Sequence, residues 1–356
     1  MKILDFFFDA YDNLKKLPGG QSSHNDENQG LLAKIIPTTI MLLILIVLIL
    51  GFIWNSESDA FNPVQRASQL ANDRGEEITT GYITTAALII TAEALLDKRG
   101  GYLSNDVMPP GLFMDNIPNW EFGVLTQIRD LTLALRNDIT RSQSQSVEDK
   151  HIIEADNKFR IDSESWLLPP AESEYRKGID SLYGYLGRLA DENTQDGQFY
   201  ARADNLSEWL GLVSKRLGSL SQRLSASVGQ SRLNTDLAGD ANAQQSTPTD
   251  NIVEVKTPWL KIDDVFFEAR GSAWALSQLL TAAESDFQDV LKKKNALVSL
   301  QQIIRELDAT QEAVWSPVIL NGGGFGVFAN HSLVMANYIS RANAAVIDLR
   351  SLLKQG

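Results

Sequence analysis

The residues best suited to chemistry are two aspartates, Asp106 and Asp115, in a segment rich in proline and glycine. Paired carboxylates act as general acid and base, or as a nucleophile, in the hydrolysis of glycosidic bonds. Acidic residues are abundant in this chain, however, and the spacing of these two matches no fixed motif. The pair by itself therefore does not define a catalytic site.

The segment that holds them, residues 98–120, cannot be one helix because glycines and prolines interrupt it. It also carries too much apolar area for a flexible linker, and long ordered loops are often functional. Two interpretations stay open: a loop pinned onto the body by its apolar side chains, or a surface for a ligand or partner. The residues of that surface would be Tyr102, Asp106, Phe113, Asp115 and Trp120.

The second unusual motif is a glycine-rich stretch that precedes a helix predicted to begin at the cap Asn330 and to run to Leu353. Such loops can present backbone N–H groups to an anion. This one lacks both Gly-Lys-Ser/Thr and the G-x-G-x-x-G spacing, so we expect a tight packing turn with Phe325 and Phe328 in the core. Its residues are Asn321, Gly322, Gly323, Gly324 and Gly326.

Metal and nucleophile chemistry have few candidate residues. The chain has no cysteine and three histidines, of which His24 lies before the apolar segment described next. A histidine metal site would need His151 and His331 together, and no G-x-S-x-G accompanies a triad. We read His331 as a first-turn helix residue. The 191–197 stretch has its glycine one place late for a calcium loop and is read as a turn between helices. No metal or cofactor is predicted.

An uncharged apolar run, Ile35–Trp54, has the length that a helix needs to cross a bilayer. It follows a long polar tail, unlike a cleavable signal, so we expect it to remain as the anchor. Lys15, Lys16 and Lys34 precede it, whereas the first basic residue after it is Arg66. The positive-inside rule then places the N-terminus in the cytoplasm and the body in the periplasm of a bacterial inner membrane.

The charge balance excludes one class of partner. The chain has a net charge of −13, and after residue 54 it carries 28 Lys and Arg against 40 Asp and Glu. Nucleic acids and anionic lipids are bound through basic patches. We therefore expect no nucleic-acid partner; the expected partners are the bilayer, through 35–54, and an envelope protein or a second copy of the chain.

Helical periodicity dominates the rest. Tyr175, Ile179, Leu182, Leu186 and Leu189 recur at spacings of four and three, which is the pattern of helices packed side by side. A second seam consists of Leu206, Leu210, Val213, Leu217, Leu220 and Leu224, with Asp204 as the expected N-cap. The apolar part of 81–96 is too short for a second span and predicts a buried helix. The fold is predicted to be mainly α.

These patterns divide the chain into five parts. Residues 1–34 form a cytoplasmic tail with an amphipathic helix over 1–17 and a polar linker over 21–30. Residues 35–54 form the span. Residues 55–228 and 251–356 form the two parts of one helical body, and 229–250, small and polar, form a flexible connection between them.

Two stretches carry a resemblance to a known family. They are SPVILNGGGFGVFANHSLVMANYISRANAAVIDLR (316–350) and VFFEARGSAWAL (265–276). The chain resembles a family of proteobacterial single-pass inner-membrane proteins known only as a domain of unknown function, family 2333. The resemblance implies an envelope location and provides no catalytic residues.

Two functions fit these observations. The first is a membrane-anchored structural, scaffold or regulatory component of a cell-envelope complex, which requires an anchor and packed helices. The alternative is a binding module or hydrolase for cell-wall glycan or peptide that uses carboxylates near the 98–120 loop. A cleft with paired carboxylates would favour the alternative, and an exposed apolar patch would favour the scaffold.

Overall fold

The computed structural model describes residues 26–143, 145–191, 196–233, 252–316, 318–322 and 327–355. The chain divides into two compact units, 1–50 and 51–356. The expected amphipathic helix over 1–17 lies outside the described residues, as do most of the 229–250 connection and Gly323–Gly326 in the glycine-rich stretch.

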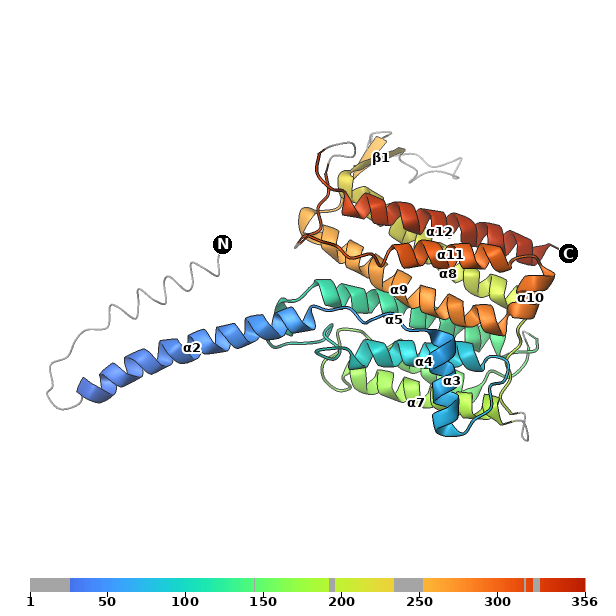
Figure 1. Cartoon of the computed structure of the whole chain (residues 1–356), viewed down its shortest axis with the longest axis horizontal. Coiled ribbons are helices and arrows are strands. Elements are labelled where there is room, and N and C mark those ends of the chain that lie inside the picture. The colour runs from blue at the N-terminus through green and yellow to red at the C-terminus, as the bar shows by residue number, and fades with distance from the viewer. Residues whose placement is uncertain are drawn as a thin grey trace, which may run out of the picture. The chain divides into compact units, whose positions relative to one another are not determined.

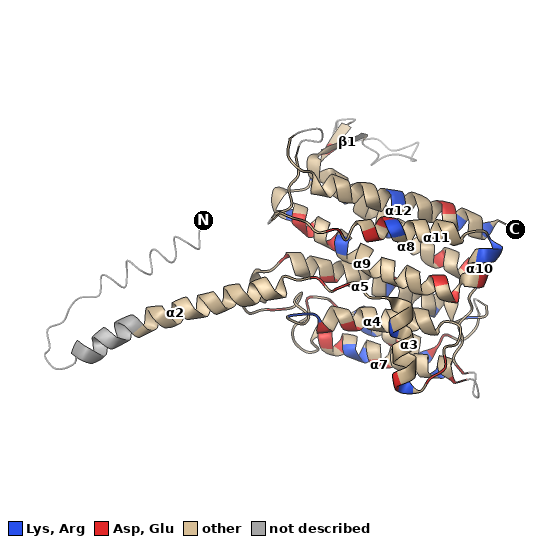
Figure 2. Ribbon diagram, in the orientation of Figure 1, with Lys and Arg blue, Asp and Glu red and all other residues tan. Residues whose placement is uncertain are grey.

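The first unit consists of most of one long helix, α2 (Asp26–Trp54). Its segment Ile35–Trp54 is the one stretch of the described chain that is long and apolar enough to cross a membrane. Figure 2 shows this segment without a charged side chain. The helix begins at Asp26, so the expected linker over 21–30 is wrong in its second half.

The second unit is a body of helices. These are α3 (Pro63–Arg74), α4 (Tyr82–Asp97), α5 (Asn116–Ala134), α6 (Lys150–Phe159), α7 (Ala171–Ala190), α8 (Ala203–Ser225), α9 (Ile262–Asp286), α10 (Gln288–Lys293), α11 (Leu297–Ala309) and α12 (His331–Lys354). Short helical turns are η1 (Gly111–Phe113), η2 (Leu135–Ile139), η3 (Ala226–Val228) and η4 (Trp259–Lys261). The prediction of a mainly α protein is confirmed.

The two seams predicted from periodicity are buried, because they are the faces along which the helices pack. Leu182 and Leu186 of α7 and Leu210 and Leu217 of α8 are fully inaccessible to solvent. The face of α7 packs on α6 and α4, and that of α8 packs on α12. Helix α4 is buried along most of its length, so the prediction of a core helix rather than a second span over 81–96 is also confirmed.

Helix α9 lies at the centre of the body and contacts α4, α5 and α11 (Figure 1). It approaches α5 most closely at two glycines. A Cβ on Gly271 would lie 2.0 Å from the Trp120 carbonyl oxygen, and one on Gly123 would lie 2.1 Å from that of Glu268. No side chain fits at either position, so these glycines set the spacing of the central helix pair.

Successive long helices run back and forth, so their connections gather at two ends (Figure 1). The described residues of loops 98–115, 160–170, 256–261 and 310–330 lie at the end where Gly51–Trp54 enter the body. We call this the span end. Loops 75–81, 140–149, 191–202 and 287–296 lie at the opposite, or far, end. Hydrogen bonds agree with this division: Asn105 Nδ2 donates to the Ser165 carbonyl at the span end, and the Gly81 N–H donates to Asp286 at the far end.

Three local predictions need correction or support. The N-cap of α8 is Arg202 rather than Asp204, which lies exposed in the first turn. Asn330 is the N-cap of α12, as predicted, and its Oδ1 accepts from the Leu333 N–H at 3.3 Å. The start of the 229–250 connection is not flexible coil: β1 (Gln230–Leu233) pairs antiparallel with β2 (Ile252–Val255), which follows the connection.

Candidate functional site

The five residues of the predicted 98–120 surface do not lie together on the surface. Tyr102 and Trp120 are buried, so the prediction is wrong for both. Tyr102 packs edge-on against Tyr175 at 5.7 Å, and Trp120 lies against Trp274 at 5.2 Å between ring centroids. Phe113 and Asp115 are exposed and Asp106 is half-buried. The loop is thus pinned onto the body by Tyr102 and Trp120, and a role of its exposed middle in binding a ligand or partner stays a prediction.

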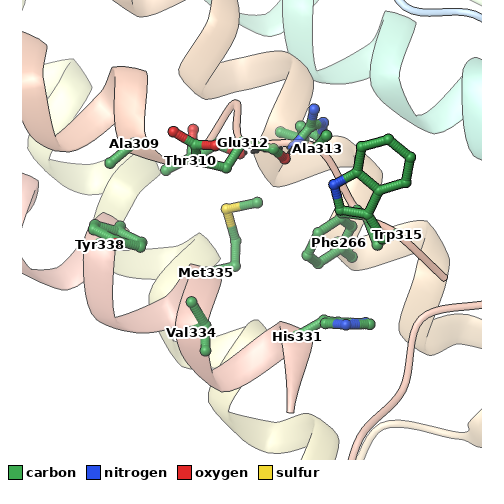
Figure 3. A pocket seen from close by; sticks show the side chains of 12 residues that line it. Phe266, Ala309, Thr310, Glu312, Ala313, Trp315, His331, Val334, Met335 and Tyr338 are labelled. Carbon is green, nitrogen blue, oxygen red and sulfur yellow. Dashed lines mark hydrogen bonds between the residues drawn. The ribbon is translucent and has the colours of Figure 1, made fainter. Parts of the chain in front are cut away.

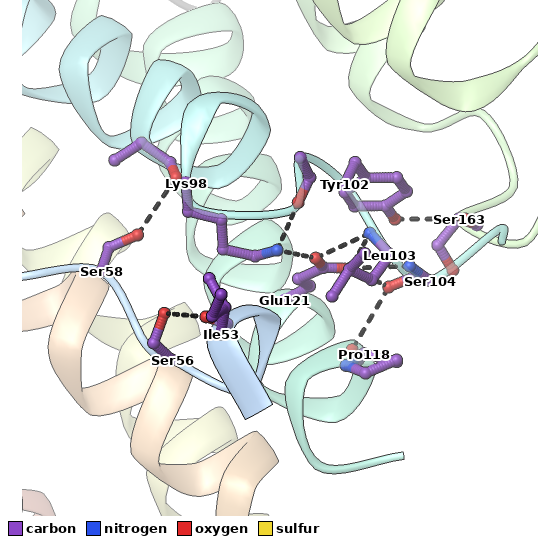
Figure 4. A network of polar contacts seen from close by, with 12 residues as sticks. Ile53, Ser56, Ser58, Lys98, Tyr102, Leu103, Ser104, Pro118, Glu121 and Ser163 are labelled. Atoms are coloured by element: carbon purple, nitrogen blue, oxygen red, sulfur yellow. Dashed lines mark hydrogen bonds and ion pairs between the residues drawn. The ribbon is translucent and has the colours of Figure 1, made fainter. Parts of the chain in front are cut away.

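A buried ion pair holds the start of this loop (Figure 4). Lys98 Nζ lies 2.6 Å from Glu121 Oε1, and both side chains are almost inaccessible. The carboxylate also accepts from the Leu103 N–H at 2.9 Å and the Ser104 N–H at 2.8 Å. Burial raises the pKa of Glu121, while Lys98, the Ser104 hydroxyl and the Leu103 N–H act in the opposite direction. With both oxygens occupied, Glu121 fixes the loop on α5 and is not free for acid or base catalysis.

Asp106 and Asp115 do not form a pair. Burial and the neighbouring Glu172 raise the pKa of Asp106. The charge of Asp115 instead adds to the raised pKa of Lys261, which its hydrogen bond to Asp264 causes first, and to that of Asp263, which burial causes first. Neither aspartate lines any of the four cavities identified in the body. Helix α5 also begins at Asn116, earlier than the predicted end of the loop at residue 120. The structure therefore offers no geometry for the proposed carboxylate chemistry at these two residues.

An apolar cavity of about 380 Å³ opens at the span end between α9, α11, the 310–315 loop and the start of α12. Figure 3 shows Met335 projecting into its middle, with Tyr338 on one side and Phe266 and Trp315 on the other. Trp315 is 96% exposed, so the cavity is open to solvent on the side where this aromatic ring forms its edge. This volume and lining suit an acyl chain or the apolar side chains of a peptide.

Arg270 fixes one wall of this cavity. Its Nε donates to both oxygens of Glu57 at 2.7 and 2.8 Å, its Nη1 donates to the carbonyls of Thr310 and Glu312 at 2.8 Å each, and its Nη2 donates to that of Gln311 at 3.0 Å. Sequence reasoning missed this residue. The available signal was one arginine inside the otherwise uncharged stretch 269–276, since a buried guanidinium needs several acceptors.

Two more cavities border the same ion pair. One, of about 350 Å³, is lined by Glu57 and Arg270 with Asn116, Asp263 and Val318. The other, of about 600 Å³, is polar and is lined by the chain just after the span together with the end of α4. The side chain of Ser58 donates to the Ala94 carbonyl at 3.1 Å across this second space. Glu57, three residues after the last residue of α2, thus lines two of the four cavities and Arg270 lines two, so three of them border the Glu57–Arg270 pair.

The described part of the glycine-rich stretch is a short bridge. Asn321 pairs with Asn330, and Asn330 Nδ2 donates to the Gly322 carbonyl at 3.0 Å. Phe328 is 74% exposed, so its predicted place in the core is wrong. Gly323, Gly324, Phe325 and Gly326 lie outside the described residues, and the choice between a packing turn and an anion site stays a prediction.

The two histidines of the body have separate roles. His331 lies in the first turn of α12, as predicted, and its Nδ1 accepts from the Leu320 N–H at 3.0 Å. The His151 ring lies against α7 at Gly184. Among the described residues no group of His, Asp and Glu is arranged to hold a metal ion.

Comparison with known proteins places the chain in a family. A family model described as "Uncharacterized protein conserved in bacteria (DUF2333)" matches residues 26–356, and the chain therefore belongs to this family. The family predicted from the two quoted stretches is confirmed. No curated protein and no solved structure matches the chain.

Proposed function

We propose that this member of a bacterial family is a single-pass membrane protein that acts as a structural, scaffold or regulatory component of a cell-envelope complex. Its N-terminus would be cytoplasmic and its helical body periplasmic. The apolar segment Ile35–Trp54 and the lysines before it support this topology. A reporter that is active only outside the cytoplasm should work when fused after Gly356, and activity of a cytoplasm-only reporter there would contradict the proposal.

The observation that carries the proposal is the convergence of three cavities on the Glu57–Arg270 pair at the span end. The pair joins the chain leaving the span to the central helix α9 and to the 310–312 loop. A partner segment bound in the apolar cavity would therefore contact an element tied directly to the anchor. This arrangement suits a protein that reports or fixes the position of a partner beside the membrane.

Site-specific crosslinking in intact cells tests this. A photo-crosslinking amino acid at Val334, which lines the apolar cavity and is 56% exposed, should capture a defined envelope protein that mass spectrometry identifies. The matched control is Ile347, which is 52% exposed on the same helix and lines none of the four cavities. Equal capture at both positions, or none at Val334, would remove the support for a binding role of this cavity.

The alternative, a module for cell-wall glycan or peptide, rests on a different cavity. The polar space of about 600 Å³ is lined by Asp59, Glu93 and Asp97 together with Arg66 and Arg99, a mixture that suits a zwitterionic or hydroxyl-rich ligand. Two of its carboxylates already have partners: Glu93 accepts from the Tyr183 hydroxyl at 2.8 Å, and Asp97 pairs with Arg176. Titration of the full chain with soluble peptidoglycan fragments should give saturable binding if this alternative holds.

A further inference from the structure

The exposed apolar side chains of the body are concentrated at one end. The described residues of loops 98–115, 160–170, 256–261 and 310–330 include four, three, two and five large exposed hydrophobic residues, respectively. In the described residues of the four far-end loops there are two, Ile78 and Val147. We call the exposed apolar side chains of the four span-end loops the span-end apolar surface. Water-exposed patches of this kind mark a surface that is covered in use.

Aromatic residues and leucine dominate this surface. Phe113, Trp166, Trp259, Trp315 and Phe328 are 54–96% exposed, and they come from all four loops. Leu168 is 87% exposed and has a positive φ of 54°, which is unfavourable for a leucine. Tryptophan, phenylalanine and leucine on loops of one face are the side chains by which proteins insert into the headgroup region of a bilayer.

The length of the tether brings the bilayer to this surface. Helix α2 ends at Trp54, and Glu57 is already held by Arg270. Three residues span at most about 10 Å when fully extended. The last turn of the helix also belongs to the body: Trp54 lies against Gly100, and Gly51 against Pro110. If Ile35–Trp54 crosses the membrane, the body cannot be far from the lipid headgroups.

We propose that the span-end apolar surface inserts into the outer leaflet of the membrane that holds the anchor. The body would then contact the bilayer in two ways, through the transmembrane helix and through loops that insert shallowly. The occupant of the surface is lipid. This inference rests on the membrane location in the proposed function and adds a second lipid contact to it.

The charges of the four loops indicate how this contact works. Their described residues include five Lys and Arg and five Asp and Glu, so the loops have no net charge (Figure 2). Electrostatic attraction to anionic lipid requires an excess of basic residues. Insertion should therefore depend on apolar burial, proceed with zwitterionic lipid and be insensitive to salt.

The chain has no cysteine, so single cysteines can be labelled with an environment-sensitive fluorophore in the full-length protein. The protein is reconstituted in phosphatidylcholine vesicles with the label at Leu168 or Trp259, at Val147 as the far-end control, or at Leu45 as the anchor control. We expect quenching by aqueous iodide to be at least about threefold weaker at Leu168 and Trp259 than at Val147, because shallow insertion reaches ~5–10 Å. Quenching by lipid-borne nitroxide should show the opposite order.

The controls separate the two proposals. If the Leu45 label is in lipid while Leu168 and Trp259 quench like Val147, the insertion of the loops is refuted and the anchor stands. If the Leu45 label is itself exposed to water, the proposed membrane location fails. If Leu168 and Trp259 are shielded in cells but not in vesicles, the surface is covered by protein, and lipid as its occupant is refuted.

The variant Leu168→Gly tests loop insertion without destabilising the fold. Leu168→Gly suits the positive φ and should leave thermal stability unchanged or higher. It should nevertheless increase iodide quenching of the label at Trp259, because one inserted side chain is lost. An unchanged quenching pattern would show that Leu168 makes no contact with lipid and would contradict the proposal for this loop.

Discussion

The closest helix contact in the body gives the sharpest prediction. Gly271→Ala would place a Cβ 2.0 Å from the Trp120 carbonyl oxygen and 2.8 Å from its carbon. An ordinary contact needs more than 3 Å, and both groups are helix backbone, so no side-chain rotation relieves the overlap. Helices α5 and α9 must therefore move apart by about 1 Å, which loosens the Trp120–Trp274 contact between them.

The magnitude follows from two opposing effects. Overpacking a core costs about 1–3 kcal/mol, and the upper end applies here because backbone is displaced. Alanine in a helix favours folding over glycine by about 1 kcal/mol. The net loss in the free energy of unfolding is then about 2 kcal/mol, which lowers the Tm by roughly 3 °C for a body of this size.

The matched control is Gly218→Ala, also inside a helix. A Cβ there would be 3.5 Å from the Asn343 amide nitrogen, an ordinary contact. Only the helix-propensity effect remains, so this variant should be more stable by up to about 1 kcal/mol. Thermal unfolding of the full chain in detergent, followed by circular dichroism, measures both. If Gly271→Ala raised the Tm as much as Gly218→Ala did, the reasoning about the α5–α9 contact would be refuted.

Three further predictions test the body. Arg270→Met should cost about 3–5 kcal/mol because it leaves Glu57 and three backbone carbonyls without their donor; chemical denaturation that shows less than 1 kcal/mol would contradict the role given to this arginine. Leu217→Asp should destabilise the body by several kcal/mol, since it buries a carboxylate in the α8 seam, whereas Val298→Asp on the exposed side of α11 should change stability by less than about 0.5 kcal/mol. Burial raises the pKa of Asp286 above its unfolded value of about 3.9, so its protonated form favours the folded state. Its contribution is complete below the unfolded pKa and is lost as the pH rises through the folded pKa; Asp286→Asn should flatten that part of the pH profile, and an unaltered profile would mean that another group titrates.

The interactions within single helices could be predicted from the sequence. The seams of α7 and α8, the buried α4 and the Asn330 cap depend on residues three to four positions apart, and helical geometry alone brings these together. The apolar segment Ile35–Trp54 could also be predicted, because its length and lack of charge are local properties of the sequence. The family resemblance was likewise carried by contiguous stretches.

Interactions between distant segments could not be predicted in this way. Gly178, Gly184, Gly187, Gly211 and Gly218 all lie inside helices, yet a Cβ would be within 3.2 Å of a neighbour at only the first, second and fourth. The closest approach of two helices is at Gly123 and Gly271. Whether a glycine is needed depends on what the facing helix places opposite it.

The candidate site depended on tertiary structure for the same reason. Tyr102, Phe113 and Trp120 are all aromatic residues of the segment 98–120. Packing of Tyr102 on α7 and of Trp120 on α9 buries these two and leaves Phe113 exposed. Arg270 finds its acceptors 40 or more residues away. The span-end apolar surface exists because back-and-forth helices bring four distant loops to one end. The sequence alone determined the helices and the apolar segment Ile35–Trp54, and the packing of those helices decided which side chains remain free to meet a ligand, a partner or the membrane.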